Sequence, residues 1–219
     1  MRKIQRLAAV GAMAVLTTMV GACSSAQGPA NNSAPPNGEA TAPTGSGVTK
    51  ISDIFGPACG QVPTEGPGSA QGMVTDPVGT AASHNPLLTT LTKAATAANL
   101  VDTLNSAPAI TVFAPADPAF AALETQNPGI TTQLTTAPDV ASPNSQLAKV
   151  LTYHVVGQRY DSAGMVQAGT LTSLEGTELT IGGTAAAPTV NGVPVLCGNI
   201  PTANATVFVI GQVLSPSAS

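Results

Sequence analysis

Cysteine side chains offer the most informative chemistry in this sequence. Apart from Cys23, the chain has Cys59 and Cys197, an even pair in a chain whose N-terminal segment, described next, predicts export to an oxidising compartment. A disulfide is the expected state of such a pair, with two reduced and buried thiols as the alternative. Closing a loop of 197 − 59 = 138 residues stabilises a fold by about 4 to 5 kcal/mol in the chain-entropy model. We expect this bond near the two ends of the folded region.

Cys23 ends a segment that has the features of an export signal. Basic residues at its start precede an apolar run over residues 7–20, which is in the signal-peptide range and too short to span a bilayer comfortably. The run leads into Val20-Gly21-Ala22-Cys23, which resembles the bacterial lipobox, whose thiol is alkylated by diacylglycerol before cleavage. We expect removal of residues 1–22 and a lipid anchor at Cys23, on the extracytoplasmic face of the cell membrane, with a shed or secreted form as well. The alternative is a soluble protein cut after residue 22.

Catalytic and metal-binding patterns are missing from the sequence. His84 and His154 lie 154 − 84 = 70 residues apart without a partner at metal-ligand spacing. No nucleophile elbow, phosphate-binding loop or dinucleotide fingerprint occurs. Glu175 and Glu178 could be a carboxylate pair for glycoside hydrolysis, but they flank a turn expected at Gly176, where solvated charges are the usual outcome. We therefore expect no metal, no cofactor and no enzymatic activity.

Charge further limits the partners of the mature chain. After Cys23 the sequence keeps 7 − 3 = 4 basic residues against all 11 acidic ones, which gives a net charge of 4 − 11 = −7. This balance argues against nucleic acid as a partner. It also argues against electrostatic attachment to anionic lipid, since no polybasic cluster follows the signal segment. A covalent anchor is then the expected link to the membrane.

Composition divides the mature chain into a tether and one domain. Residues 24–47 contain Ser, Ala, Pro, Gly, Asn and Thr with a single charge at Glu39, and such a segment cannot bury enough apolar surface to repay its ordering. With Cys23 it makes a disordered tether over residues 23–47. Residues 48–216 suffice for one domain, whose core must use Val, Leu, Ile and Ala because aromatics are only 3% and Trp is absent.

Helices are predicted in the first half of this domain. Five dipeptides each place a capping side chain directly before a proline that suits the first helical position: Asp76-Pro77, Asn85-Pro86, Asp117-Pro118, Asn127-Pro128 and Ser142-Pro143. Apolar residues follow at helical spacing. Each dipeptide therefore predicts a helix start.

The second half is predicted to be mostly β. The hydrophobic period changes from near 3.6 to 2 around Leu151, which predicts a helix running into a strand. Strands are predicted at residues 170–174, 178–181, 189–190, 193–196 and 206–210. Asn191-Gly192 is a type I′ hairpin signal, and Pro194 suits an edge position. Thr111-Val112-Phe113 predicts an early strand that pairs with this later region, which makes an α+β domain.

These landmarks together resemble the fasciclin domain family. Residues 111–120, Thr-Val-Phe-Ala-Pro-Ala-Asp-Pro-Ala-Phe, are similar to its first signature, and Leu151-Thr152-Tyr153-His154-Val155-Val156 to its second. Residues 205–210 with Val213-Leu214 resemble its closing strand. Further similarity, including Thr202 to Thr206, is to mycobacterial surface lipoprotein antigens with one such domain. The resemblance implies a single domain whose short N-terminal helices pack on a C-terminal β-rich wedge.

The resemblance also implies a function and a candidate site. Tyr153-His154 is the pair that the family links to cell adhesion, so we expect a surface-exposed antigen, a monomer, that binds an unknown surface or matrix protein. If both residues lie on a strand, their rings point to opposite faces, and a buried, hydrogen-bonded histidine with a structural role is the competing interpretation. A carrier or sensor for a small apolar envelope molecule is the other functional hypothesis, because a core of small side chains leaves room for a cavity.

Overall fold

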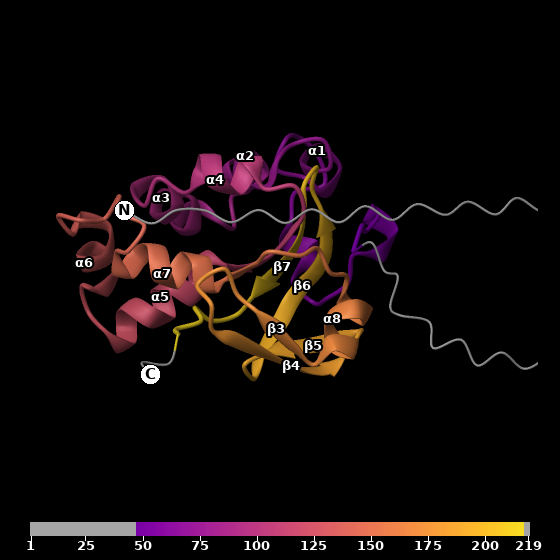
Figure 1. The fold of residues 1–219 in the computed structure, drawn as a ribbon. Helices are drawn as coiled ribbons and strands as arrows, with labels where there is room; N and C mark the ends of the chain where they lie inside the picture. The colour runs from indigo at the N-terminus through magenta and orange to yellow at the C-terminus, as the bar shows by residue number, and fades with distance from the viewer. Residues whose placement is uncertain (1–46, 217–219) are drawn as a thin grey trace, which may run out of the picture. The chain divides into compact units, whose positions relative to one another are not determined.

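The computed structural model describes residues 47–216, in which short helices lie beside a twisted sheet (Figure 1). Two single-turn 3-10 helices come first, η1 (Ile51–Asp53) and η2 (Cys59–Gln61). The α-helices are α1 (Ala70–Met73), α2 (Val78–His84), α3 (Thr89–Ala97), α4 (Val101–Ser106), α5 (Asp117–Gln126), α6 (Ile130–Thr136), α7 (Gln146–Tyr153) and α8 (Ser162–Ala168). The expected signal peptide and nearly all of the expected tether lie outside the described residues.

The strands form one mixed sheet of seven in the order β2-β1-β7-β6-β5-β4-β3. Their bounds are β1 (Ile110–Pro115), β2 (Val155–Val156), β3 (Thr170–Thr172), β4 (Glu178–Thr184), β5 (Ala187–Val190), β6 (Val193–Pro201) and β7 (Ala205–Ile210). Only the β1–β7 pair is parallel. A bridge between Val156 and Ser173 joins the two edges of the sheet, so the sheet nearly closes on itself. The α+β prediction is confirmed.

The pairing of β1 with β7 joins the two halves of the chain. Six registered pairs run from Ile110 opposite Ala205 to Pro115 opposite Ile210, and every residue of both strands is buried. Between them the rings of Phe113 and Phe208, both fully buried, lie 5.8 Å apart. Most of the remaining core is aliphatic and rich in alanine, but it includes this aromatic pair, which composition alone does not predict.

Each of the five Asp/Asn/Ser-Pro dipeptides lies near the start of a helix, but only Asp117-Pro118 occupies the first helical positions. The prediction that the first residue of each dipeptide caps the helix that follows is wrong, because most of these caps come from other elements. Asp117 is the first residue of α5, yet its carboxylate accepts hydrogen bonds from the backbone N–H of Thr90 at 2.8 Å and the hydroxyl of Thr89 at 2.6 Å, at the start of α3. Asn105 in α4 accepts from the backbone N–H of Gly79 in α2 at 2.9 Å. Because helices of this length are marginal alone, these long-range caps fix their mutual packing.

Asn204 makes the most extensive of these links, and its loss should be costly. From the β6–β7 turn, its side-chain oxygen accepts from the N–H of Val78 in α2 at 2.9 Å. Its amide nitrogen donates to the carbonyls of Leu104 and Ala107, each at 2.8 Å. We expect Asn204→Ala to lower the free energy of unfolding by roughly 2 to 3 kcal/mol, at about 1 kcal/mol per lost hydrogen bond, as measured by urea denaturation.

Asn204→Asp is the matched variant for this position. It keeps the oxygen that caps α2 but turns the donor side into a second acceptor facing two carbonyls. We expect it to be no more stable than Asn204→Ala at pH 7. Recovery of wild-type stability by Asn204→Asp would show that only the α2 cap matters.

Two local predictions are wrong, for reasons visible in the packing. The predicted helix does run into a strand, but the strand does not begin at Leu151, because α7 continues through Tyr153 and β2 contains only Val155 and Val156. Ser145 caps α7 by accepting from the backbone N–H of Ala148 at 3.0 Å, and the helical spacing of its apolar residues persists to the end. A two-residue strand is too short for its period to compete with that of the preceding helix.

Pro194 does not lie on an edge strand. It belongs to β6, which has neighbours on both sides, and it pairs with Thr189 across the hairpin. Proline is tolerated here because the pairing of β6 with β7 begins only at Val195. No hydrogen bond to β7 therefore requires an N–H at Pro194. The hairpin prediction itself is confirmed, since Asn191 and Gly192 have φ of 50° and 79°, as a type I′ turn requires.

Candidate functional site

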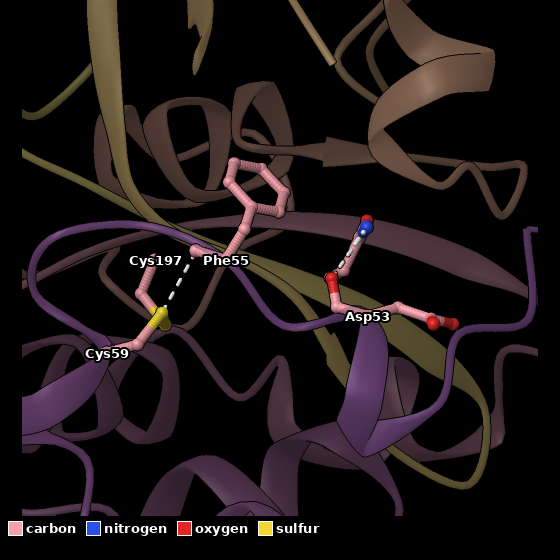
Figure 2. The surroundings of a disulfide bond; sticks show 5 residues. Asp53, Phe55, Cys59 and Cys197 are labelled. Atoms are coloured by element: carbon pink, nitrogen blue, oxygen red, sulfur yellow. Dashed lines mark hydrogen bonds between the residues drawn. A yellow bond between two sulfur atoms is a disulfide. The ribbon is translucent and has the colours of Figure 1, made fainter. Parts of the chain in front are cut away.

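The segment from Gly47 to Val62, here called the N-terminal strap, lies against β6 and is fastened to it covalently. The structure joins Cys59 to Cys197, the pairing expected from the sequence, with 5.0 Å between the Cα atoms and 138 residues of separation. Figure 2 shows this disulfide beside Phe55, whose backbone forms an antiparallel bridge with Gly198. A Cβ at Gly198 would lie 2.5 Å from the ring of Phe55, so glycine is required for the strap to lie this close.

Asn199 adds a polar link between the strap, β6 and α8. Its amide nitrogen donates to the carbonyl of Asp53 and to the hydroxyl of Ser162, both at 3.1 Å, and its oxygen accepts from the backbone N–H of Ser162 at 2.9 Å. The residue has φ of 58°, a left-handed conformation that Asn adopts more readily than most residues. At the start of the strap, Gly47 accepts from the hydroxyl of Thr206 at 2.7 Å.

Tyr153 is the last residue of α7, and its ring lies in the core enclosed by the sheet. Only 3% of the residue is exposed. Its hydroxyl accepts from the amide of Asn191 at 2.8 Å and lies 3.4 Å from the carbonyl oxygen of Glu178. Tyr153 therefore ties the end of α7 to the β5–β6 turn and to β4, and a partner cannot contact it without unfolding.

His154 caps the C-terminus of α7 and is also buried, with 2% of its surface exposed. Its Nδ1 lies 2.7 Å from the carbonyl oxygen of Val150, and its Nε2 lies 2.9 Å from the backbone nitrogen of Leu214. These partners require the neutral tautomer with its proton on Nδ1, because Nε2 must accept from an N–H. Burial lowers the pKa of His154 to about 4, against the bond to Val150, which raises it. The geometry is that of a structural histidine.

Two apolar hollows flank α7 and share Leu151 and His154 as a wall. One, of about 70 Å³, lies toward α2, α3, α4 and β1. The other, here called the helical pocket, measures about 180 Å³ and lies between α5, α6, α7 and the C-terminal segment at Val213–Ser215. Neither hollow has an Asp, Glu, Lys or Arg in its lining. Such sites suit uncharged groups rather than ions.

The remaining candidate residues are not brought together as a reactive centre. Glu178 is exposed at the start of β4, and Glu175 accepts a hydrogen bond from Thr177 in the adjacent turn. His84 lies 3.7 Å from Asp76 near the surface. Within residues 47–216, no three His, Cys, Asp or Glu side chains are grouped as metal ligands, and no helix there is long and apolar enough to cross a membrane. Cys23 lies outside the described residues.

Comparison with known proteins settles the family. The model of the fasciclin domain matches residues 86–216, more than half of the chain and the whole of the sheet described above. The chain belongs to the fasciclin domain family. The match begins after the strap, α1 and α2, so the disulfide joins a residue outside the matched fasciclin domain to one inside it.

Relatives of this chain include two mycobacterial proteins. The chain is 42% identical over 175 residues to the immunogenic protein MPB70 of Mycobacterium bovis, covering 76% of this chain and 84% of that protein. It is 36% identical over 222 residues to the cell surface glycolipoprotein MPB83 of the same species, covering 96% of both. Its fasciclin fold is similar to a solved FAS1 domain pair from the insect cell adhesion molecule Fasciclin I, with a TM-score of 0.57 and 17% identity over 64% of this chain and 51% of that one.

Several structural contacts of this fasciclin domain could not be predicted from the sequence. Asn199 and Asn204 each connect three elements, but neither lies in a dipeptide or spacing that predicts a turn or a cap. The left-handed φ of Asn199 is a property of the fold rather than of its neighbours in sequence. The helical pocket is assembled mainly from three helices and a segment that begins 213 − 153 = 60 residues after the end of α7, which no local pattern indicates.

Proposed function

We propose that this chain is a non-enzymatic protein of the cell surface, anchored by lipid at Cys23 and exposed as an antigen, which mediates adhesion or protein interaction through its fasciclin domain. The observation that carries the proposal is the 96% coverage of both chains in the alignment with the cell surface glycolipoprotein MPB83. An alignment of that extent includes the segment around Cys23. The lipobox-like motif therefore falls within the similarity to a lipoprotein.

The structure is consistent with a domain that presents surface rather than performs chemistry. Tyr153 and His154 are 3% and 2% exposed and are fully used in hydrogen bonds, so adhesion must rely on other, exposed residues. The mature chain carries four basic and eleven acidic residues, which favours partners with a basic or neutral surface. The disulfide and the long-range caps give this surface a fixed shape.

The anchor and the adhesion can be tested together with Cys23→Ser. In a mycobacterial host fed an alkyne fatty acid, we expect the wild-type chain to take up the label and to partition into detergent. Cells that carry it should adhere to matrix-coated or cell-coated surfaces more than cells without it. Cys23→Ser should lose the label, move to the aqueous phase and lose the adhesion, because the folded domain is then no longer held on the cell.

Three results would count against this proposal. Label retained by Cys23→Ser would place the lipid elsewhere. A wild-type chain in the aqueous phase would favour the soluble, secreted form cut after Ala22. Equal adherence with and without the anchored chain would remove adhesion as the function.

A second candidate function is the carriage of a small apolar molecule, which the helical pocket supports. Its volume of about 180 Å³ exceeds that of an engineered 150 Å³ cavity known to bind benzene. Native mass spectrometry of the folded chain purified from its envelope should then show a bound molecule of low mass. A spectrum with the protein mass alone, under conditions that preserve the fold, would count against it.

A further inference from the structure

We propose that the helical pocket binds the apolar end of an uncharged amphiphile and leaves its polar end at the rim. This inference rests on the carrier function above and specifies its ligand class. The pocket lies between α5, α6, α7 and the C-terminal segment, and none of its lining is shared with the disulfide or the N-terminal strap.

Large apolar side chains surround the hollow without filling it. Phe120 and Leu123 come from α5, Ile130 and Leu134 from α6, and Val150 from α7. All five are half-buried rather than buried. No residue of α6 is fully buried, although this helix turns two large aliphatic side chains, four residues apart, toward the pocket. An apolar ligand would remove these surfaces from water, which is the main source of affinity in such a site.

The lining carries no charge that could pair with an ionic ligand. Its only titratable side chain is His154, whose two ring nitrogens are already bound to backbone groups. The carboxylate of Glu124 in α5, which is not part of the lining, accepts from the backbone N–H groups of Gly129 and Thr131 at the start of α6. A buried carboxylate or ammonium without a partner is costly, so a ligand with an ionic end should be rejected.

The rim offers donors and acceptors without charge. Asn127 and Gln146 contribute amides, and Thr131, Thr135 and Ser215 contribute hydroxyls. Such groups hydrogen-bond a hydroxyl, ester or amide from either side. The combination of an apolar hollow with an uncharged polar rim fits a single short chain or ring that ends in such a group.

The absence of tryptophan from the chain allows a direct test. Phe120→Trp in the mature chain with Cys23→Ser places one emitter in the pocket wall and removes the covalent lipid as a competitor. We expect 6-bromohexan-1-ol to quench this emission saturably, at concentrations at least tenfold lower than 6-bromohexanoate at pH 7.5. Leu123→Trp, in the same wall, is the second reporter if Phe120→Trp does not fold.

Val48→Trp is the control reporter, since Val48 is 62% exposed on the strap and does not line the pocket. It should show only linear, collisional quenching. Saturable quenching of Val48→Trp with the same midpoint would overturn the assignment to the pocket. Equal or tighter binding of 6-bromohexanoate would overturn the uncharged ligand class while leaving a carrier function standing. Binding of neither compound to a folded reporter would remove the carrier function itself.

Discussion

Removal of the Cys59–Cys197 bond is expected to lower the free energy of unfolding by about 4 to 5 kcal/mol. The bond closes a loop of 138 residues, and a loop of that length restricts the unfolded chain by about this amount in the chain-entropy model. Since domains are stable by only about 5 to 15 kcal/mol, the loss is a large share of the total. Urea denaturation of the mature chain with Cys23→Ser, with and without a reducing agent, measures it.

The double variant Cys59→Ala/Cys197→Ala is the control for this experiment. It should match the reduced protein and be insensitive to the reducing agent. The bridge between Phe55 and Gly198 and the bond from Asn199 to Asp53 should still hold the strap in the folded variant. Coincident unfolding curves for oxidised and reduced wild type would show that the bond does not stabilise the fold.

Acidification is expected to destabilise the domain by about 3 kcal/mol through His154. Burial lowers its folded-state pKa to about 4 from an ordinary value of 6.5, and one pKa unit corresponds to about 1.4 kcal/mol. Between these values the unfolded chain binds the additional proton, so stability is complete above pH 6.5 and falls as the pH drops toward 4. Protonation of Nε2 also removes the acceptor for the N–H of Leu214. Denaturant midpoints at half-unit steps of pH measure the slope.

Two carboxylates limit the pH range in which the effect of His154 can be measured alone to pH 6.5 to 4.5. Partial burial raises the pKa of Asp117, but hydrogen bonds from Thr89 and Thr90 outweigh it and leave the pKa below its ordinary value. Backbone hydrogen bonds from Thr131 and Gly129 hold the pKa of Glu124 below its ordinary value. Stability from both groups is lost only as the pH falls below about 4.5.

His154→Gln and His84→Ala separate the histidine effect from other causes. His154→Gln keeps a donor and an acceptor but cannot titrate, so its stability should be lower at pH 7 and nearly flat across the window. His84→Ala removes the other histidine, which is near the surface, and measures any share that it has in the slope. An unchanged slope in His154→Gln would exclude His154 as the titrating group.

The helices, strands and turns were predictable where one residue pair or one hydrophobic period determines the local structure. Asn191-Gly192 gave the hairpin, the dipeptides ending in Pro77 and Pro118 gave helix starts, and the apolar run at Thr111 gave the early strand. Tyr153 was misplaced because its neighbours fit both a helix and a short strand, and only the cap at Ser145 and the packing of α7 decide between them.

The candidate site was predictable only in its covalent part. The cysteine count predicts the Cys59–Cys197 pair without knowledge of the fold. The partners of His154 are a carbonyl in its own helix and an N–H at Leu214, 60 residues later, and no sequence pattern specifies the second. The helical pocket depends on how far three helices stand apart, which is set by the packing of side chains and not by their order.

The strap has a mechanical consequence for a chain held by its N-terminal end. Tension applied there enters the domain at Gly47 and must first peel the strap, whose twelve-residue stretch to Cys59 can extend by about 40 Å at most. The load then passes through the two sulfur atoms to Cys197, in the middle of β6, a strand with neighbours on both sides. A domain pulled in this way should extend by the length of the released strap and then resist further extension as a unit.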